Sequence, residues 1–150
     1  EVFRDNRYVP SASGKRFVTE NPATGKPLVQ VSESGEADVN LAVASAREAF
    51  RSGVWSSMAP ADRKTILLRW ADLIDKHRLD ITLLEVLEAG KPVSETFNGD
   101  ITETAKCIRW HAEAIDKLND FVTPTDPSIL AMVRREPLGV VAAVLPWNFR

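Results

Sequence analysis

The chain has 150 residues, of which 44% are hydrophobic and 27% charged, and its formal net charge is −2. This ordinary globular composition excludes a disordered tail, a collagen-like repeat and a disulfide-rich miniprotein. The slightly acidic charge argues against nucleic acid as a partner, because phosphate-binding surfaces are usually basic. No apolar run approaches the roughly 18 residues that a membrane span needs, so no membrane partner is expected.

The cysteine content bears on the cellular compartment. Cys107 is the single cysteine of the chain, so no internal disulfide can form. A lone thiol is typical of a reducing, cytoplasmic setting.

The first part of the chain is predicted to consist of strands and turns. Residues 2–9 have the composition of an extended run, and a second such run begins at Phe17. Residues 21–25 (Asn-Pro-Ala-Thr-Gly) are a strong turn signal, and residues 28–31 return as a strand. This pattern predicts a hairpin-like arm at the N-terminus.

Four helices are predicted next, from apolar residues that recur at intervals of three and four. The first spans residues 36–52 and stops at Gly53, the second begins at Pro60, the third spans 80–90 and the fourth spans about 93–119. The residues expected to be buried on the second and fourth helices are Ile66, Leu67, Trp70, Leu73, Ile74, Phe97, Ile101, Ala105, Ile108, Trp110, Ala112 and Ile115.

The last residues change character again. Residues 129–133 alternate as a strand, and residues 139–145 form a continuous run of small and β-branched apolar residues. Such a run predicts a strand covered on both faces, as in the parallel sheet of an α/β protein. The chain stops where the next helix should begin, so we expect it to be the opening portion of a larger α/β protein.

The residues after that run are candidates for chemistry, because ligands in open α/β sheets bind beyond the carboxyl ends of the strands. There Asn148 could donate an N–H to a developing oxyanion, and Trp147 could lie against a flat cofactor. The residues alone leave a second interpretation open, in which Asn148 caps the next helix and Trp147 packs on the sheet.

Five segments, in order along the chain, resemble the aldehyde dehydrogenase superfamily: residues 21–25, 37–50, 88–92, 135–140 and 139–149. The resemblance implies the N-terminal part of a Rossmann-like NAD(P)-binding α/β domain with a β-arm and a four-helix segment. It places the arm and helices of that domain at 1–122, a bridging and oligomerisation strand segment at 123–137 and an incomplete first core strand at 138–150.

The resemblance also implies an activity. The superfamily oxidises aldehydes to carboxylic acids with NAD or NADP, of which NAD is favoured here, by means of a cysteine nucleophile and a glutamate base. It implies that Asn148 helps to hold the oxyanion and that Phe149 lines the substrate tunnel. The positions that correspond to the cofactor-binding strand end are Val144, Leu145, Pro146 and Trp147. The positions that correspond to a monovalent-cation site are Thr19, Glu20 and Glu88. Members assemble as homodimers or homotetramers through strands such as 129–134.

Asp100 and Glu103 are candidate substrate residues. Their spacing places both carboxylates on one helix face, which by itself is typical of a solvated charged surface. Residues 108–117, however, resemble the γ-glutamyl-γ-aminobutyraldehyde dehydrogenase branch. In that family this helix borders the substrate entrance, so the resemblance implies an aldehyde derived from putrescine or another polyamine.

The sequence departs from the family in two respects. Arg150 stands where the family usually has a proline, and the family's nucleophile and base lie downstream of residue 150. We therefore expect about the first third of a family-sized chain, inactive alone, with Cys107 as a structural helix residue. The alternatives are a truncated homologue that acts as a non-catalytic helical interaction module, and a semialdehyde dehydrogenase with an acidic substrate. His77 and His111 lack partners at metal-ligand spacing, so no zinc or iron site is expected.

Overall fold

The computed structural model describes residues 1–145 and begins with two antiparallel hairpins. The first joins β1 (Val2–Arg4) to β2 (Arg7–Val9). The prediction of one extended run over 2–9 was wrong, because Asp5 and Asn6 both have positive φ and form the two-residue turn that suits a tight hairpin. The second hairpin confirms its prediction: β3 (Arg16–Asn21) pairs with β4 (Lys26–Ser32) around the turn at 21–25.

Three helices follow at the predicted places. They are α1 (Glu36–Arg51), α2 (Pro60–Lys76) and α3 (Arg78–Ala89). At the start of α1, the Asp38 carboxylate accepts hydrogen bonds from the backbone N–H of Gly35 (3.1 Å) and of Ala12 (2.8 Å). The helix is thereby tied to the loop that joins the two hairpins.

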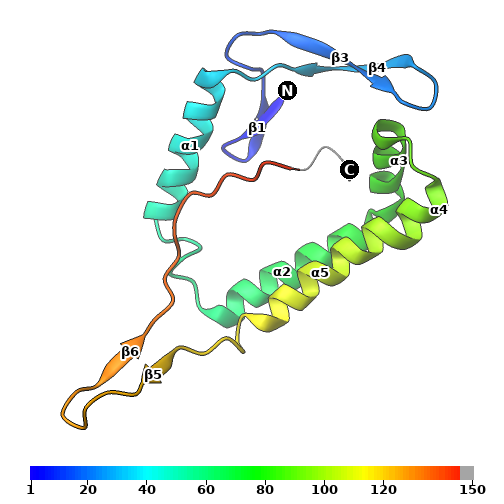
Figure 1. Ribbon diagram of the computed structural model, residues 1–150. Helices are drawn as coiled ribbons and strands as arrows, with labels where there is room; N and C mark the ends of the chain where they lie inside the picture. The colour runs from blue at the N-terminus through cyan, green and yellow to red at the C-terminus, as the bar shows by residue number, and fades with distance from the viewer. Residues whose placement is uncertain (146–150) are drawn as a thin grey trace.

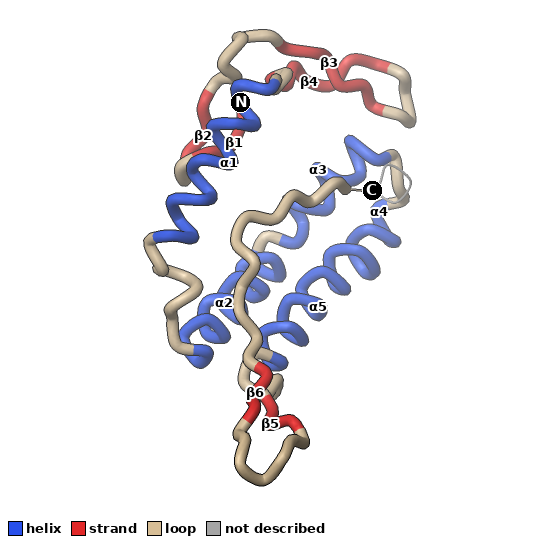
Figure 2. Tube along the Cα trace, turned by 60° about the vertical axis from the view of Figure 1, so that its left-hand side comes forward, coloured by secondary structure: helices blue, strands red, loops and turns tan. Residues whose placement is uncertain are grey.

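The predicted fourth helix is interrupted and shorter than expected. It consists of α4 (Val93–Glu95), a π-helical turn η1 (Thr96–Asp100) and α5 (Ile101–Ala114). It therefore ends five residues before the predicted limit of 119. α5 lies along α2 (Figures 1 and 2). Ala71 on α2 and Ala105 and Ala112 on α5 are almost fully buried, so small side chains let the two helices approach closely.

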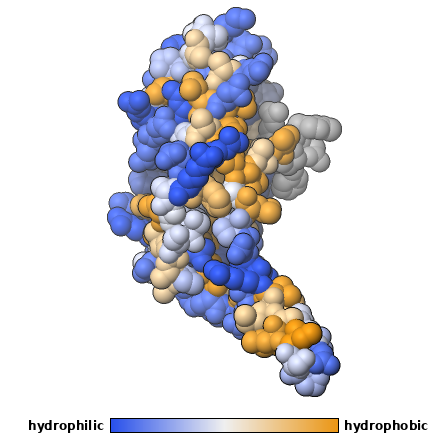
Figure 3. All heavy atoms as spheres, turned by 90° about the vertical axis from the view of Figure 1, so that its left-hand side faces the viewer, coloured by the Kyte–Doolittle hydropathy of each residue, from blue (hydrophilic) through white to orange (hydrophobic). Residues whose placement is uncertain are grey.

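A third hairpin projects from the helices as an arm (Figures 1 and 2). It pairs β5 (Phe121–Thr123) with β6 (Ala131–Val133). β6 occupies the end of the strand predicted at 129–133, whereas β5 was not predicted. Hydrophobic residues are exposed on this arm (Figure 3), among them Leu130 and Met132, which are 73% and 71% exposed.

The predicted buried strand over 139–145 is absent: these residues carry no regular secondary structure, and Val144 is 96% exposed. The physical reason is that no strand within residues 1–145 lies beside this run to complete its hydrogen bonds. The whole chain exposes 11,814 Å², whereas a compact monomer of 16.6 kDa exposes about 7,600 Å².

Part of the predicted core is not buried, because the helices too lack neighbouring elements within residues 1–145. The stripe on α5 is confirmed, since Ile101, Ala105 and Ala112 are buried. Several residues predicted to be buried are instead about half exposed or more, namely Ile66, Trp70, Leu73 and Trp110. Within residues 1–145, no helix is both long and apolar enough to cross a bilayer.

Candidate active-site segment

The predicted oxyanion and tunnel residues lie at the very end of the chain. Pro146, Trp147, Asn148 and Phe149 fall outside the described residues, so their roles stay predictions. Val144 and Leu145 are described, and their side chains are 96% and 81% exposed. Both belong to the run that has no neighbouring strand within residues 1–145, and their role at the cofactor stays a prediction.

The structure brings Asp100 and Glu103 together on a hollow of about 670 Å³. Asp100 ends η1, and Glu103 lies in the first turn of α5. The hollow is lined by Trp70, Glu85, Lys91, Asp100, Ile101, Glu103, Thr104, Cys107 and Ile108. Three carboxylates and one ammonium in this lining give a formal charge of −2. The hollow therefore combines apolar walls with negative charge.

The two carboxylates differ in their surroundings. Asp100 forms a salt bridge with Lys91, and both side chains are about one-third exposed or less. Glu103 pairs with Lys106 at 2.7 Å, but both of these side chains are more than 60% exposed. Exposed pairs of this kind are weak, so Glu103 can exchange its partner at little cost.

Cys107 lines the hollow, yet its neighbours do not activate it. Its Sγ lies 3.6 Å from Nδ1 of His111, one turn along α5. The same Nδ1 lies 2.8 Å from the carbonyl oxygen of Cys107. A nitrogen that donates its hydrogen to this carbonyl cannot also accept the thiol proton. This geometry supports the prediction that Cys107 is not the nucleophile.

The residues predicted for a monovalent cation lie on two elements that contact each other, β3 and α3. Thr19 and Glu20 flank an irregularity in the β3–β4 pairing, and Glu88 is exposed near the end of α3. The turn after β3 reaches α3, because a Cβ placed on Gly90 would lie 2.8 Å from Cγ of Pro22. The hydroxyl of Thr19 is already engaged, since it donates to the carbonyl of Val29 at 3.2 Å. Within residues 1–145, no cluster of three or more His, Cys, Asp or Glu side chains is placed to hold a metal.

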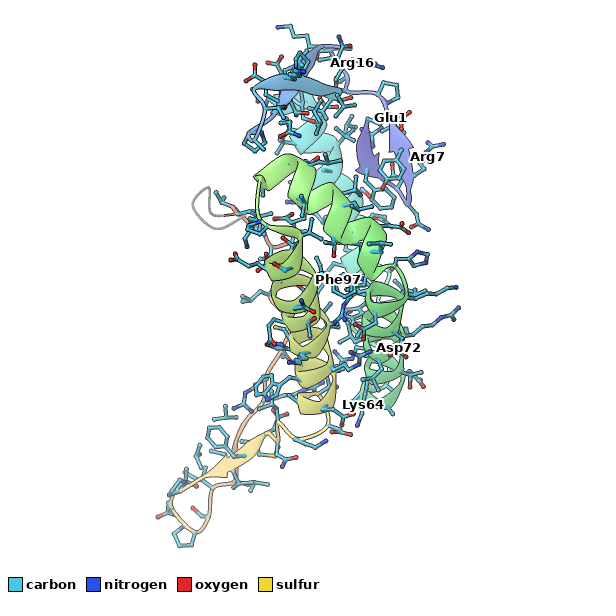
Figure 4. All side chains as sticks on the ribbon, turned by 90° about the vertical axis from the view of Figure 1, so that its right-hand side faces the viewer. Glu1, Arg7, Arg16, Lys64, Asp72 and Phe97 are labelled. Carbon is cyan, nitrogen blue, oxygen red and sulfur yellow. The ribbon has the colours of Figure 1, made fainter. Side chains whose placement is uncertain are left out.

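Ion pairs between charged residues link α2 to α5. Arg109 contacts Asp72 and Asp75 at 2.7 Å each, and Lys64 contacts Glu113 at 2.6 Å. Figure 4 shows Lys64 and Asp72 in the seam between the two helices. The hydrogen bond between Lys64 and Glu113 raises the pKa of the lysine and lowers that of the glutamate. Both therefore remain charged near neutral pH, and the contacts are structural.

Several residues at or near the hollow were not predicted from the sequence. Lys91 was expected only as part of the loop at 88–92, and neither Glu85, which lines the hollow, nor Thr102, in the first turn of α5, was predicted. One signal was available: Gly99 interrupts the apolar pattern of the predicted fourth helix, and a glycine there often marks an irregular helix. The structure places Gly99 inside the π turn.

Comparisons with known proteins identify the family of the chain. A model described as the aldehyde dehydrogenase family matches residues 8–150. An aminoacetaldehyde dehydrogenase of Pseudomonas aeruginosa is 48% identical over 148 residues, which are 99% of this chain and 30% of that protein. The chain thus spans about 30% of the length of this relative.

Solved structures share the fold. The crystal structure of a γ-glutamyl-γ-aminobutyraldehyde dehydrogenase from Burkholderia cenocepacia is 48% identical, with a TM-score of 0.94. An indole-3-acetaldehyde dehydrogenase in complex with NAD+ is 44% identical, with a TM-score of 0.92. Each comparison covers 98% of this chain and 30% of the other. These matches confirm an α/β N-terminal portion, and the chain belongs to the aldehyde dehydrogenase family.

Proposed function

We propose that these residues form the N-terminal part of an NAD(P)-dependent dehydrogenase that oxidises amine-derived aldehydes to carboxylic acids. The observation that carries the substrate class is the hollow beside η1 and α5, with apolar walls and a formal charge of −2. An ammonium group on the substrate would be attracted to this lining, whereas a carboxylate would be repelled. A relative named for aminoacetaldehyde supports the same class.

In this proposal, the end of the chain meets the cofactor and the reacting aldehyde. The side-chain amide of Asn148 donates to the oxygen on which negative charge develops. Val144, Leu145, Pro146 and Trp147 lie along the cofactor, which supplies the hydride acceptor, and Phe149 lines the substrate tunnel. NAD is the favoured cofactor, and a similar protein is known in complex with NAD+.

We also propose a cation site, an oligomeric state and a cellular location. Thr19, Glu20 and Glu88 would lie near a monovalent cation, and the packing of Pro22 against Gly90 is what brings their elements together. The complete protein would be a homodimer or homotetramer, and the exposed apolar arm formed by β5 and β6 suits such a contact. A cytoplasmic location rests on the single cysteine.

The substrate class is tested in the complete protein that contains these residues. The probes are 3-aminopropanal and butanal, which differ by an ammonium in place of a methyl group. We expect Asp100→Asn and Glu103→Gln each to lower kcat/KM for 3-aminopropanal by about 1.5- to 5-fold, the range for partly exposed charge pairs. The rate with butanal should stay unchanged.

The control variant is Asp80→Asn, which removes one negative charge from the exposed first turn of α3, outside the hollow lining. It should leave the ratio of the two substrates unaltered. Equal effects of the Asp100 and Glu103 variants on both substrates would contradict the amine-derived class. A preference for an aldehyde that carries a carboxylate would point instead to the semialdehyde alternative.

A second candidate, a non-catalytic helical interaction module, has one observation in its favour. The chain exposes 11,814 Å², well above the value of about 7,600 Å² for a compact protein of its mass. Sequencing the reading frame beyond Arg150 separates the two candidates. A continuation with a cysteine in a family-like motif favours the dehydrogenase, and an immediate stop codon favours the module.

A further inference from the structure

Arg63, in the first turn of α2, carries a buried polar atom without a partner. Within residues 1–145, its Nε has no hydrogen-bond acceptor, and no carboxylate forms an ion pair with its guanidinium. Arg78 also has an unpartnered Nε, but another nitrogen of that guanidinium already donates to Thr102. Buried donors in native proteins are paired, because an unpaired donor loses its hydration without replacement. We therefore expect the complete protein to supply an acceptor to Arg63.

The charge around Arg63 favours an anionic acceptor. The positive end of the helix dipole lies at the first turn of α2, and Asp62 in the same turn is exposed and not paired with Arg63. A hollow of about 920 Å³ beside Arg63 contains two more guanidiniums and two carboxylates, those of Arg134, Arg135, Asp120 and Glu136. Asp120 already accepts the backbone N–H of Arg135 at 3.1 Å, and Glu136 is exposed. The lining therefore keeps a formal charge of +1, and no carboxylate within residues 1–145 pairs with Arg63.

A second hollow, of about 440 Å³, shares Arg63 and has mostly apolar walls. Phe50 at the end of α1 and Trp55 in the loop after it form one wall, and Leu138 lies in the other. The second wall belongs to the run that was predicted as a buried strand. This run passes the end of α1 (Figure 1), where a Cβ placed on Gly139 would lie 3.6 Å from the Phe50 ring. The unpaired guanidinium and the uncovered run thus adjoin one hollow.

One element can cover both, because they adjoin the same hollow. We propose that the element of the complete protein that covers residues 139–145 also brings a carboxylate to Arg63. Its occupant is a segment of the same chain beyond residue 150, with apolar side chains in the 440 Å³ hollow and an Asp or Glu at the rim. The chain spans 30% of the length of a relative, so the remaining length can supply such a segment. This inference rests on the proposed role of these residues as the N-terminal part of a longer dehydrogenase.

The test is thermal unfolding of the complete protein as a function of pH. Arg63→Met keeps an unbranched side chain and removes the charge, so its midpoint at pH 7 should lie about 2–4 °C below the wild-type value. This deficit should shrink below about pH 5, because burial raises the pKa of the unpaired carboxylate and its protonation removes the penalty of a buried charge. Arg69→Met is the matched control, since Arg69 is exposed on α2 and lines neither hollow, and it should show no deficit. Arg63→Lys should show about half of the deficit, and its pH profile decides if Arg63→Met does not fold.

Three results would overturn the inference. A deficit of the same size at pH 7 and pH 4.5 would assign the acceptor to a neutral group. An equal, pH-dependent deficit in Glu136→Gln would place the partner within residues 1–145. A saturable rise of the wild-type midpoint with hexanoate, abolished by Arg63→Met, would make the occupant a free ligand. Dehydrogenase activity of the wild-type protein is measured separately: its absence would reject the proposed function, and the pH profile would still decide whether Arg63 binds a carboxylate.

Discussion

Gly90, which ends α3, offers a quantitative test of how the N-terminal arm is attached to the helices. Its φ of 73° and ψ of 15° are left-handed, and a Cβ there would lie 2.8 Å from Cγ of Pro22 and 3.5 Å from its Cβ. Gly90→Ala therefore faces two penalties: the left-handed conformation costs about 1–2 kcal/mol, and forcing a methyl group into a filled contact costs about 1–3 kcal/mol. Pro22 sits on a surface turn that can give way, so we expect the lower end of the second range.

Gly25→Ala separates the two penalties. Gly25 has a nearly identical φ of 65°, but a Cβ there meets nothing within 4 Å. The change in the unfolded chain is the same for both variants, so it cancels in the comparison. The difference between them should thus be about 1 kcal/mol, with Gly90→Ala the less stable.

The assay is thermal unfolding of the complete protein and both variants, run side by side in one buffer. Gly90→Ala should unfold at a lower temperature than Gly25→Ala. Equal midpoints would show that the turn at 21–25 does not rest on the end of α3, and the proposed cation site would then lose the packing that brings its elements together.

Three further predictions concern the anchor of α1, the α2–α5 seam and the uncovered surface. The backbone N–H groups of Ala12 and Gly35 donate to Asp38 and lower its pKa below the ordinary 3.8. The ionised carboxylate therefore stabilises the fold above pH 3.8, and this stabilisation is lost as the pH falls through the lowered pKa. The unfolding temperature of Asp38→Asn should consequently lie below the wild-type value at pH 7 and approach it below pH 3.8; a gap that widens in acid would refute this. Ala105→Leu should destabilise the complete protein by about 1–3 kcal/mol in thermal unfolding, because Ala105 is 1% exposed between α2 and α5, whereas an unchanged midpoint would show room in that seam. Residues 1–150 alone expose apolar faces, so they should enhance the fluorescence of an apolar dye such as ANS more than the complete protein does, compared per chain. Equal enhancement would show that these apolar faces are not accessible to the dye in residues 1–150.

The local features of this chain were predictable because they depend on neighbouring residues. Pro60 at the start of α2 and Gly90 at the end of α3 act within one helical turn, and both helices lie where the sequence indicates. The hairpin of β3 and β4 likewise follows from the turn at 21–25. The break at Asp5 and Asn6 was missed because two polar residues with positive φ resemble an ordinary polar stretch of strand.

Features that depend on distant residues were not predictable from the pattern. In the fourth helix, Gly99 is a local signal for the π turn, and the turn contains it. The contact that reaches the next residues from another helix has no local signal, since Arg78 on α3 donates to the hydroxyl of Thr102, 24 residues away. Burial likewise depends on residues that are far apart in the sequence. Trp70 is 53% exposed, although its helical spacing indicates a core position.

The candidate site shows how these two kinds of information combine. The spacing of Asp100 and Glu103 correctly indicates one shared face, but it cannot show that Lys91 pairs with Asp100 while Glu103 keeps only an exposed partner. Of these two carboxylates, a cationic substrate that approaches the hollow therefore meets one that is already neutralised and one whose pair is weak. Glu103 is the residue that should bind the substrate ammonium directly. Asp100 should act by keeping the Lys91 ammonium paired and away from the substrate. For that reason Glu103→Gln should raise KM for 3-aminopropanal by direct loss of charge, whereas Asp100→Asn should act partly by releasing the Lys91 ammonium into the hollow. Combining Lys91→Met with Asp100→Asn should accordingly recover part of the lost preference, and the absence of any recovery would assign the whole effect to the Asp100 charge itself.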